Sequence, residues 1–453
     1  MNRRDIIRVV VGMALSSSAA VDCVKSNSSL SVRHAPAYLT DAGTVASAPM
    51  DVARYGMLVP LQVGTDAVAY LVNRGCYVGE VPGVERWNYD FEDGVDVIVK
   101  GRTEQKLAVT RSGVENGRFV VRYPMVGGFV PQGALLSGAP HPHGGSGFFI
   151  SQALSHQIAK DGTFDWRNPG MIRTIEVRQV RYDGRSLSVE PPATYDPDKP
   201  LAVGLEGWRL FVPGISPAIP DGDDLLLPIS ASHGGTGRKA VGLSRWRCPN
   251  GVWGAVSFTP IAFTDPKNEH AYMEPSVARD AEGRLVFAAR DDGRIDRSVK
   301  KPRTAYNQDL IAWISSDSGK NWRVFVHAEG VRRPGPVSVG RTVDGQIFLA
   351  ANPITPGIPG RSRIDIWPVD ANGRLGESVT VCDAEKEFGK NGAYWCVDHP
   401  VSAILRGPDG TTRSVLAYRV RDPYFYPFRP GKVFPVPSKQ AGAYIDEIRS
   451  IIP

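Results

Sequence analysis

The sequence predicts an all-β protein folded as a β-propeller of six blades, with a seventh blade as the alternative. The chain of 453 residues contains 48 Gly and 36 Pro, which favours short strands joined by turns. A hairpin-like pattern recurs along it, and its last four turn glycines are 61, 62 and 65 residues apart. A near-constant period of this length is typical of a radial array of similar sheets.

The first element, residues 1–25, is predicted to be an export signal. Arg3 and Arg4 precede a short apolar run, Val9–Ala14, and the small residues Ser16–Ala20. The apolar run is too short to span a bilayer as a permanent anchor. Because the paired arginines resemble a twin-arginine signal, we expect a periplasmic or extracellular protein whose mature chain does not insert stably into a membrane.

Residues 30–118 are predicted to supply extra strands or a closing blade, and residues 119–453 the propeller itself. Met57–Val63 and Val68–Val72 are apolar segments within the first region. Together with Ala443–Ile448 near the end of the chain, they are expected to provide the strands that close the ring.

Five copies of the repeat follow, each with an apolar strand, a glycine-containing turn and a second apolar strand: Met125–Leu136, Ile215–Leu227, Pro275–Phe287, Val337–Leu349 and Val401–Ala417. The turn glycines are Gly133, Gly222, Gly283, Gly345 and Gly410. Glycine adopts positive φ at little cost, so a glycine between two apolar runs is a hairpin signal.

Ser315–Trp322 matches the pattern SxDxGxxW, known as the Asp-box. In such a turn Ser315 and Asp317 are expected to bond the turn amides, and Gly319 to provide the bend. Trp322 is expected to pack between blades. The motif predicts a fold rather than an activity.

Charge and cysteine usage narrow the class of partner. The formal net charge is +6, but the basic residues are scattered, so we expect no nucleic-acid partner. A mildly positive net charge suits an acidic carbohydrate as the partner. The five cysteines show no CxxC or His/Cys spacing, so we expect neither a metal nor another cofactor. Cys382 and Cys396 are close enough in sequence to pair in an oxidising compartment.

Over residues 119–420 the chain resembles the sialidase superfamily. The matching features are Arg122 before Tyr123-Pro124, Glu274 sixteen residues ahead of Arg290, Arg361 after Asn352-Pro353, and Tyr394 ahead of the last repeat. The resemblance implies that Arg122, Arg290 and Arg361 clamp a sugar carboxylate, with Arg363 as a rival for the third position. It also implies Tyr394 as the nucleophile and Glu274 as its base.

The chain departs from that family at the general acid. The loop Ala139–Gly147, where the family carries an aspartate, contains no acidic residue. It contains His141 and His143, and imidazole can donate or accept a proton near neutral pH. His143 is therefore the predicted acid. His233, in the equivalent loop of the next repeat, is a second candidate.

The preferred function is an exported, sialidase-like glycoside hydrolase that releases a terminal acidic sugar from a glycan. Two alternatives remain open. The first is a propeller-type lyase acting on a uronate-containing polysaccharide, in which Tyr272, His143, His233 and Arg290 would act. The second is a carbohydrate-binding propeller without catalysis. A lyase yields an unsaturated sugar that absorbs in the ultraviolet. A hydrolase yields a reducing sugar without this absorbance, and a binding protein yields neither product.

Overall fold

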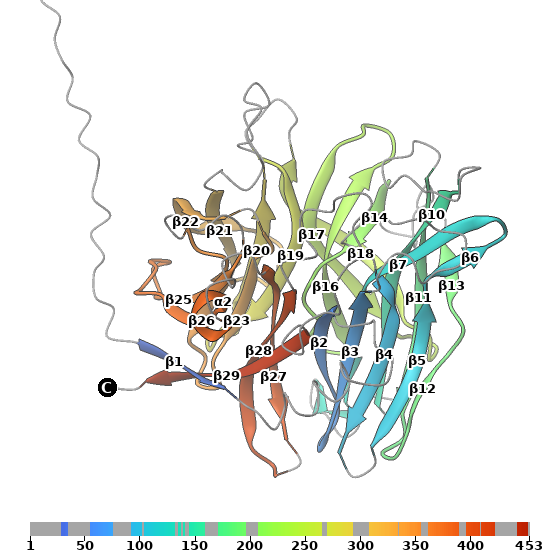
Figure 1. The fold of residues 1–453 in the computed structure, drawn as a ribbon, viewed down its shortest axis with the longest axis horizontal. Helices are drawn as coiled ribbons and strands as arrows, with labels where there is room; N and C mark the ends of the chain where they lie inside the picture. Colours follow the sequence, from blue (N-terminus) through green and yellow to red (C-terminus); the bar gives the residue numbers. More distant parts are fainter. Residues whose placement is uncertain are drawn as a thin grey trace, which may run out of the picture.

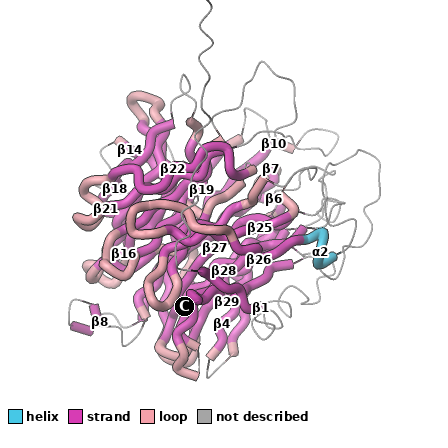
Figure 2. Tube along the Cα trace, turned by 90° about the vertical axis from the view of Figure 1, so that its left-hand side faces the viewer, coloured by secondary structure: helices cyan, strands magenta, loops and turns pink. Residues whose placement is uncertain are grey.

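The chain folds into an all-β propeller made of six sheets of four or more strands, arranged in a ring (Figure 1). The computed structural model describes residues 29–34, 55–75, 92–101, 104–131, 135–136, 139–140, 145–158, 171–195, 207–264, 270–292, 308–333, 335–354, 361–388, 396–407, 409–421 and 442–451. The predicted export signal lies outside these residues. Strands make up most of the described chain, and the short helix α2 (Ala384–Phe388) stands at its edge (Figure 2).

Blades I to III come from residues 55–264. Blade I contains β2 (Tyr55–Gly64), β3 (Ala67–Gly75), β4 (Glu92–Lys100) and β5 (Gln105–Arg111). Blade II contains β6 (Gly113–Glu115), β7 (Arg118–Val130), β10 (Gly145–Gln157), β11 (Ile172–Tyr182), β12 (Leu187–Val189) and β13 (Ala193–Tyr195). Blade III contains β14 (Trp208–Pro213), β15 (Ile219–Asp221), β16 (Asp224–His233), β17 (Lys239–Arg247) and β18 (Gly254–Thr264).

Blades IV to VI come from residues 272–451, and blade VI also includes the N-terminal strand β1. Blade IV contains β19 (Tyr272–Arg279), β20 (Leu285–Asp291), β21 (Gln308–Ser315) and β22 (Arg323–Arg332). Blade V contains β23 (Ser338–Arg341), β24 (Ile347–Ala351), β25 (Arg363–Val369) and β26 (Val379–Asp383). Blade VI contains β27 (Cys396–Arg406), β28 (Thr412–Arg421), β29 (Gly442–Ile451) and β1 (Ser29–His34).

The two ends of the chain meet in blade VI. β1 pairs antiparallel with β29, so the N-terminal strand forms the outer edge of the last blade (Figure 1). β2 of blade I contacts both β27 and β7, which closes the ring on the other side. The segments 57–63 and 68–72, expected to supply strands for closing the ring, pair with each other as β2 and β3 of blade I, and the segment 443–448 lies in β29 of blade VI. The division of the chain at residue 118 stays a prediction.

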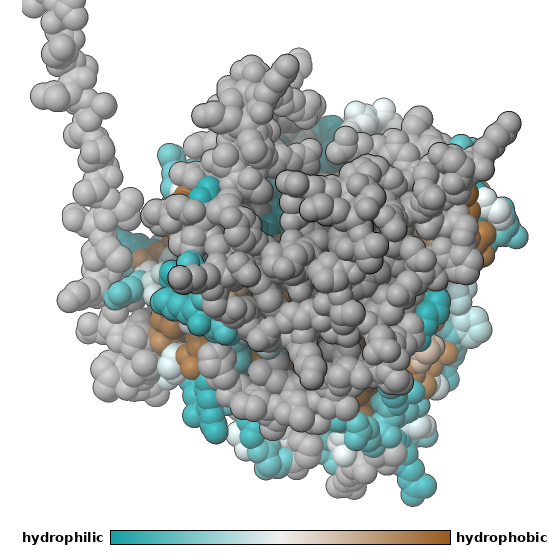
Figure 3. Space-filling model, in the orientation of Figure 1, coloured by the Kyte–Doolittle hydropathy of each residue, from teal (hydrophilic) through white to brown (hydrophobic). Residues whose placement is uncertain are grey.

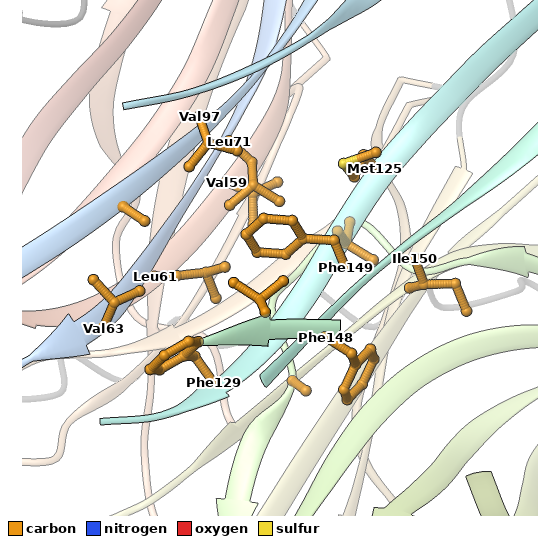
Figure 4. Close-up of a cluster of buried hydrophobic side chains, with 14 of the residues drawn as sticks. Val59, Leu61, Val63, Leu71, Val97, Met125, Phe129, Phe148, Phe149 and Ile150 are labelled. Carbon is orange, nitrogen blue, oxygen red and sulfur yellow. The ribbon is translucent and has the colours of Figure 1, made fainter. Parts of the chain in front are cut away.

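The blades pack face to face through strands that are apolar on both sides. Phe148 and Phe149 in β10 are fully buried. Phe148 stacks on Trp246 of blade III, with ring centroids 4.1 Å apart, whereas Phe149 packs with the blade I side chains Val59 and Leu71 (Figure 4). A strand covered on both faces reads as a continuous apolar run, because neither face meets water.

Four of the predicted hairpin turns have the expected backbone. Gly222, Gly283, Gly345 and Gly410 all have positive φ, between 63° and 96°. The first predicted copy was wrong, because β7 does not pair with residues 134–136. Its partner is β10, and the short strands β8 (Leu135–Leu136) and β9 (Ala139–Pro140) pair with each other. A local Gly-containing turn was therefore mistaken for the main turn of the blade.

The turn at Ser315–Trp322 is held by its own polar side chains. Ser315 Oγ accepts a hydrogen bond from the Gly319 amide (2.9 Å), and Asp317 Oδ1 accepts from the Lys320 and Asn321 amides (3.1 and 2.9 Å). Trp322 lies edge-on to Phe287 of the same blade, with ring centroids 5.9 Å apart. It packs against the cluster shared by blades III and IV.

Two further expectations concern cysteines and membranes. Cys382 and Cys396, which are close enough in sequence to pair, are both free thiols in this structure. Cys382 is buried in the core between blades V and VI. None of the described helices combines the length and apolar character needed to cross a bilayer. On the face in Figure 3, the described surface residues are mainly hydrophilic, with small apolar patches.

Candidate functional site

The candidate site is centred on two residues with strained backbone. Glu274 and His399 have φ of 49° and 53° and lie within strands, whereas the other described non-glycine residues with positive φ, Asn116 and Ser318, lie in turns. Each follows the start of its blade's first strand, at a break in the pairing register, and each precedes a proline. Such a conformation costs on the order of 1–3 kcal/mol and clusters at functional sites.

Arg290 holds Glu274 from the neighbouring strand. Its Nη1 donates to Glu274 Oε2 (2.9 Å), and its Nη2 donates to Asp292 just beyond the end of β20. Burial opposes the guanidinium charge, but the two carboxylates outweigh it and hold the pKa of Arg290 well above its usual value. The sixteen-residue spacing places Arg290 opposite Met273, beside Glu274, across the hairpin.

Blades V and VI contribute a second group of charges. Arg361, just before β25, donates from Nη1 to Asp398 Oδ2 (2.9 Å). Asp398 Oδ1 accepts from Arg419 Nε (2.6 Å) and lies 3.1 Å from His399 Nδ1. Asp398 thus ties the arginines of two blades to the strained histidine.

Arg332, at the end of β22, lies beneath these residues and is fully buried. It donates to the backbone carbonyls of Asp309 (2.7 Å) and Asp291 (2.8 Å). Burial lowers the pKa of Arg332 to about 10, although the Asp292 carboxylate acts in the opposite direction. The site therefore contains a buried cation that is satisfied mainly by peptide dipoles.

The electrostatics of Glu274 join the two groups. Burial alone would raise its pKa, but Arg290 and Arg361, together with His399 when it is protonated, lower it more, so the net shift is downward. Glu274 is accordingly ionised at neutral pH and suited to act as a base or nucleophile rather than as an acid. Groups from blades IV, V and VI therefore converge on one carboxylate.

His399 was not predicted from the sequence. Burial and Arg419 lower its pKa, against Asp398 and Glu274, so the imidazole is neutral near pH 7. A signal was present, because His399-Pro400 and Glu274-Pro275 stand at equivalent places in two repeats. The resemblance pointed to the neighbouring Tyr394, which lies outside the described residues and stays a predicted nucleophile.

Arg122 lies beside the corresponding register break of β7, but its charge is used within blade II. Its Nε donates to Glu176 Oε1 (3.0 Å) and its Nη1 to Glu115 Oε1 (2.5 Å). Within the described ranges, no hydrogen bond or ion pair joins Arg122 to Glu274, Arg290 or Arg361. Its role in a clamp stays a prediction. Arg363, the rival of Arg361, is paired with Asp365 of its own strand.

His143 lies outside the described residues, but the ends of the strands that flank it are placed. Val130 ends β7 and Gly145 begins β10, at the end of blade II opposite the register break near Arg122. Glu274 lies at such a register break, near the start of the first strand of its own blade. Proximity of His143 to Glu274 stays a prediction.

His233 and Tyr272 are both described. His233 ends β16, where its ring meets the edge of Trp208 at 5.3 Å. Its Nδ1 is buried and has no hydrogen-bond partner within the described part of the chain. Tyr272 lies two residues before Glu274 and stacks on His270, with ring centroids 5.3 Å apart. Burial, with Asp291 and Asp309 nearby, raises the pKa of its phenol.

Comparison with known proteins adds support for the fold. No family model matches the sequence, and no curated protein matches it. A Hadza microbial sialidase superposes with a TM-score of 0.50 at 14% identity, over 88% of this chain and 66% of that one. A protein of unknown function from Dyadobacter fermentans has a TM-score of 0.49 at 10% identity, over 89% and 96% of the two chains.

An alpha-L-arabinanase from Penicillium chrysogenum has a TM-score of 0.48 at 10% identity, over 87% of this chain and 93% of that one. At these identities, the likeness to the sialidase establishes the propeller fold alone. Any activity has to be argued from the side chains. Within the described residues, no group of three or more His, Cys, Asp or Glu side chains could hold a metal ion.

Proposed function

We propose that the protein is a glycoside hydrolase that removes a terminal acidic sugar from a glycan. The observation that carries the proposal is the ionised, strained Glu274, which feels the charges of arginines from two blades at one end of the ring. The sialidase resemblance of Glu274, Arg290 and Arg361 supports the same reading. An acidic sugar fits because arginine forks bind carboxylates with two parallel hydrogen bonds.

The local charges suit that task. Arg290 and Arg361 already pair with Glu274, Asp292 and Asp398, so the cluster is held in place before a ligand arrives. Preorganised charges lose less free energy to rearrangement when a substrate carboxylate binds. The nearby Arg332 adds positive potential without being able to reorient, because backbone carbonyls fix it.

The chemistry follows from the charge state of Glu274. In the predicted reaction, the Tyr394 hydroxyl attacks the anomeric carbon and its proton passes to Glu274. The bond to the aglycone breaks and the leaving oxygen takes a proton from a general acid; His143, the residue predicted for this role, follows strand ends that lie at the opposite end of blade II from the register break near Arg122. Water then attacks the anomeric carbon and gives a proton to the deprotonated general acid, while the tyrosyl–sugar bond breaks and the Tyr394 oxygen takes back the proton held by Glu274. A phenol avoids the repulsion that a carboxylate nucleophile would meet from the sugar's own carboxylate.

Replacing Glu274 by Gln tests the proposal, because the amide retains a hydrogen-bonding oxygen for Arg290 but cannot accept a proton. General-base catalysis contributes roughly 10²–10⁴-fold, so we expect turnover to fall by at least about 100-fold. The measurement is release of reducing sugar from sialyllactose and from hyaluronan and alginate oligosaccharides. Release from none of these by the wild type contradicts the proposal.

Glu282→Gln is the matched control. Glu282 lies in the turn of the same hairpin, at its opposite end, with a side chain that is 64% exposed. We expect this variant to keep full turnover and to unfold near the wild-type temperature, and Glu274→Gln, which loses a charge paired with Arg290, to be folded at the assay temperature. A Glu274→Gln protein that turns over normally would remove the carboxylate from the mechanism.

The lyase remains a second candidate because of His399. A neutral imidazole beside Arg361 and Asp398 could take the proton α to a uronate carboxylate held by the arginines. The same assay separates the two reactions, since only elimination produces ultraviolet absorbance from an unsaturated product.

A further inference from the structure

Blade III carries an exposed aromatic residue at the same end of the ring as Glu274. Phe263, near the end of β18, is 39% exposed although it is large and apolar. The guanidinium carbon of Arg238 lies 4.2 Å from the centre of its ring. Arg238 is itself exposed, and no carboxylate pairs with it within the described part of the chain. An arginine stacked on an aromatic ring keeps its hydrogen-bond donors available in the plane of the guanidinium.

Other aromatic side chains support Phe263 from behind. Trp208, partly exposed at the start of β14, lies 6.2 Å from Phe263 and 5.3 Å from Phe258, measured between ring centroids. The ring of His233 closes the other side of Trp208. Gly207 has φ of 82°, and a Cβ there would lie 3.0 Å from the His233 ring. Phe263, Trp208 and Phe258 therefore form an aromatic platform of packed rings, and Phe263 is not a single loose side chain.

The platform is continuous with the candidate site. Thr264, the residue after Phe263, exchanges hydrogen bonds with the backbone of Tyr272: the Tyr272 amide donates to Thr264 Oγ1 (3.0 Å), and Thr264 Oγ1 donates to the Tyr272 carbonyl (3.4 Å). Tyr272 lies two residues before Glu274. His270, which is 34% exposed, stacks on Tyr272 and is held by Asp291 at 2.6 Å. Two aromatic platforms thus flank the boundary between blades III and IV.

We propose that Arg238, Phe263 and the His270–Tyr272 stack form a binding surface for the sugar units of an acidic glycan beyond the unit held at Glu274. Sugar rings present apolar C–H faces that pack on aromatic rings, and Arg238 supplies a cation for a carboxylate. The inference rests on the proposed function for the identity of the bound glycan. It implies a substrate of several acidic residues and not a small glycoside.

Binding is measured separately from turnover, in a Glu274→Gln background, with hyaluronan, alginate and polysialic acid oligosaccharides of two and eight units. We expect Phe263→Ala to weaken binding of the eight-unit ligand about tenfold, and to reduce its advantage over the two-unit ligand. Arg238→Gln should weaken binding and flatten its dependence on salt, because one screened charge is lost. Arg238→Lys should keep the salt dependence but recover only part of the affinity.

Two variants at the opposite end of the ring serve as controls. Arg185 is an exposed arginine in the turn after β11, and Val324, at the start of β22, is 54% exposed. Arg185→Gln and Val324→Ala should leave the affinity unchanged. Unchanged affinity in Phe263→Ala and Arg238→Gln overturns the inference, as does binding of none of the three ligands. If either of these results is obtained and the wild type still releases sugar, the proposed function stands and only this binding surface is ruled out. If Phe263→Ala and Arg238→Gln weaken binding but the wild type releases no sugar, the result supports this surface and contradicts the hydrolase.

Discussion

At the scale of single residues, the site is defined by conformation as much as by charge. Glu274 and His399 are held at positive φ by strands that the rest of their blades fix on both sides. An ordinary strand residue would relax to negative φ, so the packing must impose this geometry. The result is a carboxylate and an imidazole from different blades that act on each other's pKa.

Replacing His399 by Gln should change how stability depends on pH. The folded-state pKa of His399 is lowered, so the unfolded chain binds its proton first, and stability falls as the pH drops through about 6.5, the value of a free histidine. We expect the free energy of unfolding of the wild type to fall more steeply between pH 7 and pH 5 than that of His399→Gln. Urea unfolding at several pH values measures it.

Equal slopes for the two proteins would contradict this prediction. Glu274 also has a lowered pKa, and its contribution is lost as the pH falls below about 4.5, the usual range of a glutamate. The window between pH 7 and pH 5 therefore separates the histidine from the carboxylate. Asp398 and Arg419 also face His399, and the variant retains both.

At the scale of elements, the hairpin turns were the feature that the sequence predicted best. The positive φ of Gly222, Gly283, Gly345 and Gly410 followed from local sequence, because only glycine tolerates it cheaply. The first copy failed for the opposite reason: residues 131–136 look like a local turn, but β7 pairs with a strand that begins at Gly145. Local patterns report turns well and long-range strand partners poorly.

In the candidate site too, the sequence predicted a contact within one hairpin but not the contacts between distant parts of the chain. The spacing of Glu274 and Arg290 lies within one hairpin, and the structure brings them together. Arg122 pairs with Glu176, which is 54 positions away in the chain. Nothing in the local sequence indicates this pairing. His399 was missed because its importance depends on Glu274 from another blade.

The turn at Ser315–Trp322 allows a test at this scale. Hydrogen bonds from the Asn321 amide and from Ser315 are the main causes that lower the pKa of Asp317 to about 2. Its carboxylate therefore stabilises the fold above about pH 4, and this contribution is lost as the pH falls toward 2. We expect Asp317→Ala to lower the melting temperature at pH 7 modestly and to leave turnover intact at 25 °C. Thermal unfolding followed by circular dichroism measures it.

An unchanged melting temperature in Asp317→Ala would mean that the turn is held by its backbone alone. Asp183→Ala provides a comparison, because Asp183 also accepts amide hydrogen bonds in a turn, at 2.7 and 2.8 Å, but in a blade without the SxDxGxxW pattern. A similar loss in both variants would indicate that amide bonding, and not the full motif, stabilises these turns.

At the scale of the whole molecule, ring closure decides stability. β1 covers the edge of β29, and Leu30 is buried in the core between blades V and VI. An uncovered strand edge offers unpaired amides and carbonyls to other chains. The closure joins residues that are more than 400 positions apart. The apolar pattern predicted a closing strand at residues 443–448, which lie in β29, but it could not specify the pairing with β1.

Removing residues 1–34 should therefore destabilise the protein, whereas removing residues 1–28 should not. The longer truncation deletes β1 and exposes both the β29 edge and part of the apolar core, which we expect to lower the melting temperature and to promote aggregation. Differential scanning calorimetry and light scattering compare the two truncations. Equal behaviour of the two proteins would show that β29 is a stable outer strand on its own.

The pairing of β1 with β29 also constrains how the protein is made. β1 and its partner β29 are more than 400 positions apart in the chain. A growing chain therefore cannot complete blade VI before β29 has been synthesised, and the strand edge that these two segments cover in the folded protein is open until then.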